Sequence, residues 1–286
     1  MTEASLLNVF KSAVGSNIDG FSTVRVSEEG ELAHVTLSRP EKHNGIDFRM
    51  LKELIAVAES LRHKRGIRAV ILRGEGPSFC AGLDFKSVLA DPVQAALGFA
   101  RLWSPTTNVF QRMSLAWRDI PVPVLAVVHG SCFGGGLQLA LGADFRFATP
   151  DAKLSVMEAK WGLIPDMGGT VTLRELVPID VAKELAMTGR IVSGIEAKAL
   201  GLVTHISDDP LEDAKKLAAE IATRSPDSVA AAKSLLHRAW SGAQDVALSW
   251  ERRFQRRLLG SKNQRIALKA SLEKQTIAFS PRKWRG

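Results

Sequence analysis

The sequence predicts an α/β protein with an additional helical region at its C-terminus. In the first half, short apolar segments typical of buried strands alternate with helical patterns, and from about residue 168 one helical pattern follows another. The chain has 286 residues, of which 45% are apolar, and this is sufficient for a large core. We therefore expect a core in residues 1–200 and a helical region in residues 201–286.

The first elements follow from local patterns. Residues 21–38 are predicted to form a hairpin, because apolar and polar residues alternate on both sides of a turn at Glu28-Glu29-Gly30. Asp47 is placed to cap a helix whose apolar residues recur at helical spacing from Met50 to Leu61. We expect buried strands at residues 69–72, 122–128, 145–148 and 154–157, and a short apolar helix at 137–141.

Six further helices are predicted from periodic apolar residues after residue 168. They cover residues 178–187, 194–200, 210–223, 225–239, 245–259 and 263–277.

Composition limits the class of protein. The two cysteines, Cys80 and Cys132, exclude a disulfide framework and could form either a redox pair or small packing contacts. No two histidines have the spacing of a zinc site, so we expect no metal. No apolar run is long enough to span a bilayer, and the N-terminus lacks the pattern of a leader, so we expect a cytoplasmic protein with no membrane partner.

Positive charge is concentrated at the C-terminus. The net charge is +8, and residues 251–286 hold eleven Lys/Arg and two Glu, a local charge of +9, so the other 250 residues sum to −1. This segment could be a solvated helical face or a surface for anions, either phosphates of a small ligand or nucleic acid. Because no groove-reading module accompanies the charge, the sequence disfavours nucleic acid.

Two glycine-rich stretches depart from the ordinary pattern. Residues 74–84 and 129–138 each follow a predicted strand, where glycines allow backbone N–H groups to face a ligand. Neither stretch has the spacing of a nucleotide-binding loop, and Ser131 is not in a nucleophile elbow. An anion site made of backbone donors remains, unless the glycines serve only close packing of helix on strand.

Four motifs in order resemble those of the crotonase (enoyl-CoA hydratase/isomerase) superfamily. They lie at residues 39–44, 79–84, 130–136 and 164–169, and the similarity extends from about residue 21 to the C-terminus. The resemblance implies a spiral of ββα units and C-terminal helices that build homotrimers, often paired into hexamers. It also implies an acyl-CoA substrate, with coenzyme A as part of the substrate and no other cofactor.

In that family the thioester oxygen lies between two backbone N–H groups. By position, the resemblance assigns these donors to Ala81 and Gly135. Such donors stabilise the negative charge that an enolate places on this oxygen, and each contributes about 2.7–4 kcal/mol.

The acid–base residues decide the reaction. Family hydratases have two glutamates, and here Glu158 stands at one of these positions while Gln138 stands at the other. An amide does not exchange a proton at neutral pH, although it can orient a water or a carboxylate. Asp166 matches an aspartate of the family's dienoyl-CoA isomerases. The plain alternatives are a surface role for Glu158, helix filler for Gln138 and an N-cap for Asp166.

The remaining ligand contacts are carried over from the resemblance. Candidate substrate and CoA contacts are Arg39, Cys80, Leu83, Asp84, Gly134 and Lys274, with Lys283 as a second C-terminal lysine. The acyl pocket is expected to be walled by residues 85–120, with bulk from Phe99, Leu102, Trp103, Val109 and Phe110.

Three functions are compatible with these residues. The first is isomerisation of an enoyl-CoA or dienoyl-CoA double bond, with Glu158 as the proton carrier and Asp166 assisting. The second is hydration of a 2-enoyl-CoA, with Asp166 or Gln138 positioning water. The third is a catalytically weak binding protein with RNA affinity, suggested by the missing glutamate and the basic tail.

Overall fold

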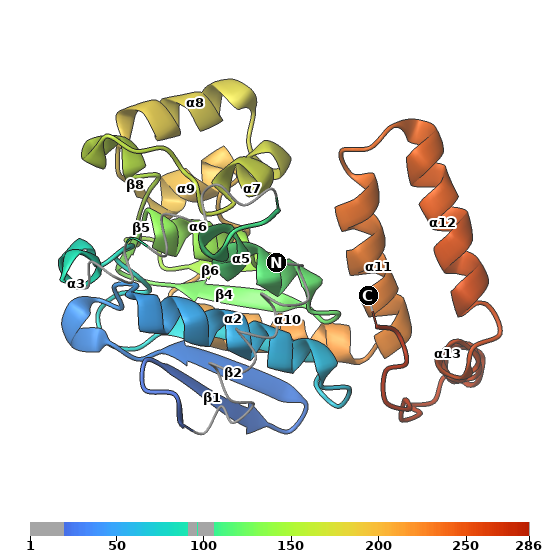
Figure 1. The fold of residues 1–286 in the computed structure, drawn as a ribbon. Helices are drawn as coiled ribbons and strands as arrows, with labels where there is room; N and C mark the ends of the chain where they lie inside the picture. Colours follow the sequence, from blue (N-terminus) through green and yellow to red (C-terminus); the bar gives the residue numbers. More distant parts are fainter. Residues whose placement is uncertain (1–19, 91–95, 97–105, 286) are drawn as a thin grey trace.

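A computed structural model describes residues 20–90, 96 and 106–285. Its centre is a six-stranded sheet with the order β1-β2-β3-β4-β6-β9, beside a three-stranded sheet with the order β5-β7-β8 (Figure 1). The larger sheet contains β1 (Val24–Glu29), β2 (Leu32–Leu37), β3 (Ala69–Gly74), β4 (Val124–Val128), β6 (Phe145–Ala148) and β9 (His205–Ile206). The smaller one contains β5 (Ser131–Phe133), β7 (Lys153–Ser155) and β8 (Val192–Ser193).

The predicted N-terminal elements are confirmed. β1 and β2 pair antiparallel, and Gly30 in the turn has φ +61°, a conformation that glycine adopts without strain. Helix α2 (Phe48–His63) follows, and the Asp47 carboxylate accepts the backbone N–H of Met50 at 2.8 Å. From β2 to β9 the strands of the large sheet are parallel, so their C-terminal ends lie along one edge.

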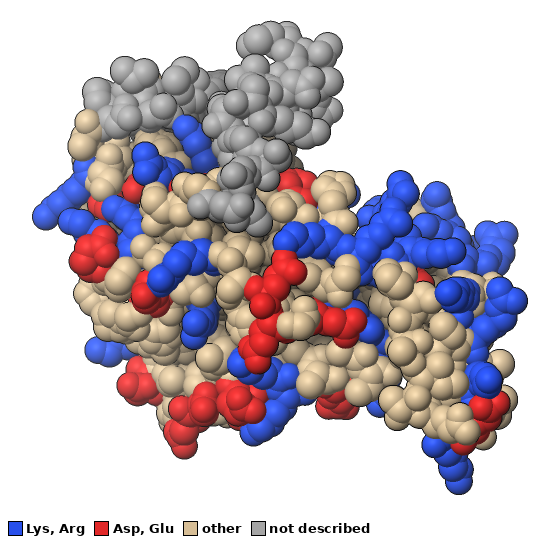
Figure 2. Space-filling view, turned by 90° about the horizontal axis from the view of Figure 1, so that it is seen from below, with Lys and Arg blue, Asp and Glu red and all other residues tan. Residues whose placement is uncertain are grey.

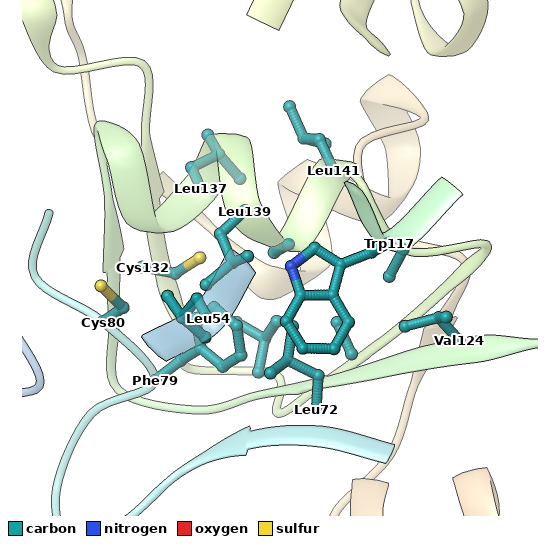
Figure 3. Close-up of a cluster of buried hydrophobic side chains, with 14 of the residues drawn as sticks. Leu54, Leu72, Phe79, Cys80, Trp117, Val124, Cys132, Leu137, Leu139 and Leu141 are labelled. Carbon is teal, nitrogen blue, oxygen red and sulfur yellow. The ribbon is translucent and has the colours of Figure 1, made fainter. Parts of the chain in front are cut away.

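The main core lies between one face of the large sheet and the helices that cover it. These are α2, α5 (Val109–Leu115), the 3₁₀ helix η4 (Ala116–Asp119) and α6 (Gly135–Leu141). Figure 3 shows Trp117 among Leu72, Val124 and Leu141, and its indole N–H is satisfied by the carbonyl of Met113 at 2.9 Å. This core supports both glycine-rich stretches, since Phe79 and Leu137 are also part of it.

The opposite face of the large sheet is covered by α10 (Pro210–Ala222). Ala214 and Ala218 of this helix pack on a second apolar cluster that includes Ile71, Leu125 and Phe147. Both β9 and α10 follow residue 200, so the layers around the sheet continue to about residue 222.

Helices α11 (Pro226–Ala239), α12 (Gln244–Leu258) and α13 (Lys262–Glu273) form an arm that stands beside the sheets (Figure 1). Phe254 and Trp284 hold the arm together by an edge-to-face contact with ring centroids 4.8 Å apart. Figure 2 shows Lys and Arg side chains gathered over the arm, as the charge distribution of the sequence predicts.

The other helical segments are short. They are α3 (Phe85–Leu89), α7 (Gly169–Leu176), α8 (Ile179–Thr188) and α9 (Gly194–Leu200), with the 3₁₀ helices η2 (Pro40–Lys42) and η5 (Glu158–Trp161). Within the described ranges, no helix has both the length and the apolar character needed to cross a membrane.

A buried ion pair attaches the arm to the sheet. Lys233 of α11 lies 2.6 Å from a carboxylate oxygen of Asp144, which directly precedes β6. The ammonium also donates to the carbonyls of Trp117 and Val122 at 3.1 and 3.0 Å, and Asp144 accepts the N–H of Val124 at 2.8 Å. The second carboxylate oxygen of Asp144 lies 3.7 Å from Nε2 of His237, so both charged groups of the pair have polar neighbours, which a buried charge requires.

We expect Lys233→Met to lower the free energy of unfolding by about 3–5 kcal/mol, because it leaves the Asp144 carboxylate buried without its counter-charge. Lys215→Met is the matched control, since Lys215 pairs with the exposed Glu29 on the surface, and a far smaller change is expected. Urea denaturation of both variants measures the difference. Equal losses in the two variants would contradict a special role for the buried pair.

Candidate active site

The two glycine-rich stretches come together as neighbouring backbone segments. Cys80 and Cys132 form a parallel bridge, with Cys80 N–H donating to the carbonyl of Ser131 at 3.0 Å. A Cβ atom on Gly136 would lie 2.4 Å from the carbonyl oxygen of Cys80, and one on Gly82 would lie 2.8 Å from that of Phe133. Both distances are too short for any side chain, so the glycines are required for this approach.

The N–H of Ala81 is not free, which corrects the sequence assignment of this donor. It donates to the carbonyl of His43 at 2.9 Å and so closes the loop that follows η2. A backbone donor already used within the protein cannot stabilise charge on a substrate without breaking that bond.

Leu83, two residues further on, presents the available N–H. Ile46 N–H donates to the carbonyl of Gly82 at 2.8 Å, and Asp84 N–H donates to that of Ile46 at 2.9 Å. In such a parallel bridge the N–H of the intervening residue, Leu83, points away from Ile46. Within the described part of the chain, this N–H has no acceptor.

In the part of the chain that the structure describes, Gly135 supplies a second free N–H close to the first. It is the first residue of α6, so its N–H has no partner within the helix. A Cβ on Gly82, the neighbour of Leu83, would lie 3.7 Å from the nitrogen of Gly135. Leu83 and Gly135 therefore form the pair of free donors. Successive N–H groups along an extended segment point in opposite directions, and this alternation is the signal that would have favoured Leu83 over Ala81 in the sequence.

Glu158 lies beside these donors, at the first position of η5. Its side chain is buried, with 8% of the residue exposed, and one carboxylate oxygen accepts the Gln138 amide N–H at 2.6 Å. A Cβ on Gly134 would lie 3.3 Å from that same oxygen. The other oxygen, Oε2, is buried and has no hydrogen-bond partner among the described residues. The carboxylate is therefore held at one oxygen and free at the other.

Gln138 fixes Glu158 and cannot itself be a proton carrier. Its amide oxygen accepts the backbone N–H groups of Met167 and Gly169, at 2.8 and 2.9 Å, where α7 begins. Because the oxygen takes two N–H groups, the amide nitrogen must face Glu158. Gln138 thus joins α6, η5 and α7, and it is a positioning residue rather than helix filler.

Both acidic residues of the site hold their protons more tightly than usual. Burial raises the pKa of Glu158, the Gln138 hydrogen bond partly opposes this, and the charge of Asp166 raises the pKa further. Asp166 keeps an exposed side chain, and the surrounding protein raises its pKa by displacing part of its water. Asp166 does not cap α7, because Gly168 occupies that position without a side-chain bond.

Arg39 has a structural task in this subunit, in contrast to its predicted contact with a CoA phosphate. Its guanidinium lies 3.3 Å from the carboxylate of Asp47 and 3.2 Å from that of Asp84, and it also donates to the carbonyl of Gly45. Asp84 in turn caps α3 through the N–H of Ser87 at 3.1 Å. These two carboxylates compensate the positive charge of Arg39 within the subunit, which weakens its attraction for a CoA phosphate.

Other predicted contacts are buried beneath the free donors or lie apart from them. Cys80 is fully buried, its thiol donates to the carbonyl of Asn44 at 3.0 Å, and burial raises its pKa to about 12, so it is a packing residue. Lys274 ends α13 and Lys283 follows in the arm, which Figure 1 shows apart from α6. Of the expected pocket wall, Phe99, Leu102 and Trp103 lie outside the described residues, whereas Val109 and Phe110 begin α5.

Comparison with known proteins shows the family of the chain. The family model for enoyl-CoA hydratase/isomerase matches residues 27–282. The chain belongs to this family. A short-chain-enoyl-CoA hydratase of Clostridium acetobutylicum is 30% identical over 259 residues, which is 90% of this chain and 97% of the relative. A mitochondrial Delta(3,5)-Delta(2,4)-dienoyl-CoA isomerase of Dictyostelium discoideum is 31% identical over 219 residues, 73% of each chain.

Solved structures share the fold. The enoyl-CoA hydratase of Polaromonas sp. JS666 superposes with a TM-score of 0.82 at 30% identity, over 91% of this chain and 100% of that one. The enoyl-CoA hydratase of Bacillus anthracis gives a TM-score of 0.82 at 29% identity, over 90% and 99%. The expected crotonase fold is therefore confirmed, and the family includes proteins named for both reactions.

We expect Glu158→Gln to be more stable than the natural protein at pH 8. The pKa of Glu158 in the folded state lies above its ordinary value of 4.5, so ionisation above the folded pKa costs stability that an amide does not lose. The advantage should disappear as the pH falls towards 4, where the natural carboxyl is protonated. Thermal melts from pH 4 to 8 measure this, with the exposed Glu251→Gln as control; a pH-independent difference would contradict it.

Proposed function

We propose that the protein binds an acyl-CoA and stabilises its thioester enolate between the N–H groups of Leu83 and Gly135. Both donors are fixed by the fold and lack internal partners in the described chain. Donors of this kind act on the charge that develops on the thioester oxygen and need no reorganisation during the reaction. The placement of Gly135 at the start of α6 adds the positive end of a short helix.

The reaction we favour is isomerisation of an enoyl-CoA or dienoyl-CoA double bond. The observation that carries it is the buried carboxylate of Glu158, which lies beside the donor pair and has one oxygen without a partner among the described residues. Glu158 removes a proton from one carbon of the acyl chain, the enolate is held by the two N–H groups, and the same carboxyl returns the proton to another carbon. A raised pKa suits both steps, because the group must hold the proton between them.

Asp166 extends this chemistry to a conjugated dienoyl chain. The charge of Asp166 raises the pKa of Glu158. With Asp166 at the more exposed side, one acid would remove a proton and the other would deliver one at a more distant carbon.

Hydration of a 2-enoyl-CoA is the second candidate. Several relatives are named as hydratases, including that of Clostridium acetobutylicum. In this reaction Glu158 would activate a water that Asp166 helps to orient. Gln138 opposes it, because its amide nitrogen donates to Glu158 and its oxygen is occupied by α7.

A homotrimer, or a dimer of trimers, completes the proposal. Helices α11 to α13 expose large apolar side chains that a neighbouring subunit would cover. They are Leu236, Trp240, Leu259, Leu268 and Leu272. Lys274 and Lys283 would reach the CoA phosphates of a neighbouring subunit, because α13 lies apart from the site of its own chain.

Incubation with 3-enoyl-, 2-enoyl- and 3,5-dienoyl-CoA, followed by mass and absorbance, should give products of unchanged mass with a shifted double bond. Glu158→Gln should lower the rate by about 10²–10⁴-fold, because it removes the proton carrier, whereas Glu251→Gln should not. Addition of one water to the 2-enoyl substrate, with no isomerisation of the others, would overturn the preferred reaction in favour of hydration.

Replacing one peptide N–H by an ester oxygen tests the donor pair. An ester at position 83, made with the hydroxy-acid analogue of leucine, should lower kcat/KM by about 10²–10³-fold. The ester at position 81 is the matched control: it breaks the bond to His43 and should lower the melting temperature with less effect on rate. Each ester also weakens one preceding carbonyl, that of Gly82 or Cys80, so the comparison cancels this effect. A larger loss of rate for the ester at position 81 would show that the N–H of Ala81, and not that of Leu83, is the donor to the thioester oxygen.

A further inference from the structure

Two aromatic rings that are not part of the main core meet beside the candidate active site. Phe85 is the first residue of α3 and Trp161 is the last residue of η5. Their ring centroids are 4.8 Å apart at an interplanar angle of 40°, which is a direct aromatic contact. Neither ring packs on the main apolar core, and Trp161 is 60% exposed, so burial of apolar area does not account for the pair.

The ring contact joins the two segments that carry the chemistry of the site. Phe85 follows Leu83, one of the free donors, by two residues. Trp161 follows Glu158 by three residues in η5, and because a 3₁₀ helix has three residues per turn, these two side chains lie on the same side of it. Within the described ranges, residues 83–89 share no hydrogen bond or ion pair with η5, so the rings provide the direct link.

The Phe85 end of the contact is fixed by polar groups around Asp84. The N–H of Asp84 donates to the carbonyl of Ile46 at 2.9 Å, and its carboxylate lies 3.2 Å from the guanidinium of Arg39. The same carboxylate accepts the N–H and the hydroxyl of Ser87 at 3.1 and 2.6 Å. These bonds fix the first turn of α3, so Phe85 is a firm support for a neighbouring element.

The Glu158 end has less support of its own. The Gln138 amide holds one carboxylate oxygen at 2.6 Å, and the other oxygen has no partner among the described residues. One hydrogen bond fixes the distance to the first oxygen but not the direction of the second, which also depends on the position of the η5 backbone. The contact of Trp161 with Phe85 restrains that backbone at the end of η5.

We propose that the contact of Phe85 with Trp161 is a positioning clamp, which sets the separation between the Leu83 N–H and the free oxygen of Glu158. The proposal rests on the function proposed above, because this separation matters only if both groups act on one substrate, in isomerisation or in hydration. A displacement of about 1 Å can lower a rate about 10²-fold. The two aromatic residues act through the donor and the carboxylate, and they do not touch the reacting atoms.

A double-mutant cycle on turnover tests the clamp. For the acyl-CoA that the natural protein converts, Phe85→Ala and Trp161→Ala should each lower kcat by about 10–100-fold, because Glu158 is displaced. The double variant should be no slower than the slower single variant, since either change removes the same contact. Trp161→Phe keeps a ring and should recover most of kcat. Leu89→Ala is the matched control, because Leu89 is an exposed apolar residue of the same helix, and kcat should be nearly unchanged.

The change in KM separates a positioning role from direct contact with the substrate. KM should change far less than kcat in the single variants. A raised KM with unchanged kcat would show that the rings bind substrate, and losses of kcat that multiply in the double variant would show that the two residues act independently. Either result would overturn the proposal, and melting temperatures show that each variant is folded.

Hydrogen exchange separates failure of the clamp from failure of the proposed function, because it needs no turnover. The N–H of Leu163 donates to the carbonyl of Glu158 at 3.0 Å and closes η5. Phe85→Ala, although distant in sequence, should make this amide exchange faster, and Leu89→Ala should not. Unchanged exchange in folded Phe85→Ala would overturn the clamp. Faster exchange supports the clamp even if the natural protein converts no acyl-CoA, a result that would overturn the proposed function alone.

Discussion

The arrangement of the site depends on the contact of two polypeptide segments at distances that leave no room for a Cβ atom. Gly82 and Gly136 meet the carbonyls of Phe133 and Cys80 directly, and this contact brings the N–H groups of Leu83 and Gly135 to one place. The main core beneath fixes the two segments against each other, because Phe79 of one segment and Leu137 of the other are packed in it. Donors held by a packed core need no reorganisation when negative charge develops on a substrate.

The acid–base character of the site depends on a neutral side chain. The Gln138 oxygen is held by two backbone N–H groups of the α7 turn, so its nitrogen always faces Glu158. A carboxylate at position 138 would accept the two backbone N–H groups at the start of α7 with one oxygen. Its other oxygen would face the Glu158 carboxylate with no hydrogen between them. The amide avoids this repulsion, so one carboxyl group rather than two dominates the buried part of the site.

Local patterns were sufficient to predict much of the fold, whereas the site needed geometry. The α2 cap at Asp47 and helix α9 follow from residues next to each other in the chain. Strands β5, β8 and β9 were missed because two or three residues carry no periodicity. Motif order selected Glu158, Gln138 and Gly135, which the structure brings together. It did not select the free N–H of Leu83, because Ala81 and Leu83 differ in the direction of their N–H groups. The ion pairs of Arg39 could not be predicted either, because the sequence does not show that Asp47 and Asp84 both lie beside its guanidinium.

The attachment of the arm constrains how this protein can change during evolution. Lys233 and Asp144 are buried against each other at the junction of α11 with the large sheet. A single substitution of Lys233 or Asp144 leaves the other residue as an uncompensated buried charge. The two positions should therefore be substituted together or both be retained. Exposed arginines of α12 such as Arg252 and Arg256 are under no such restriction, so the surface chemistry of the arm can diverge while its angle to the sheet is inherited.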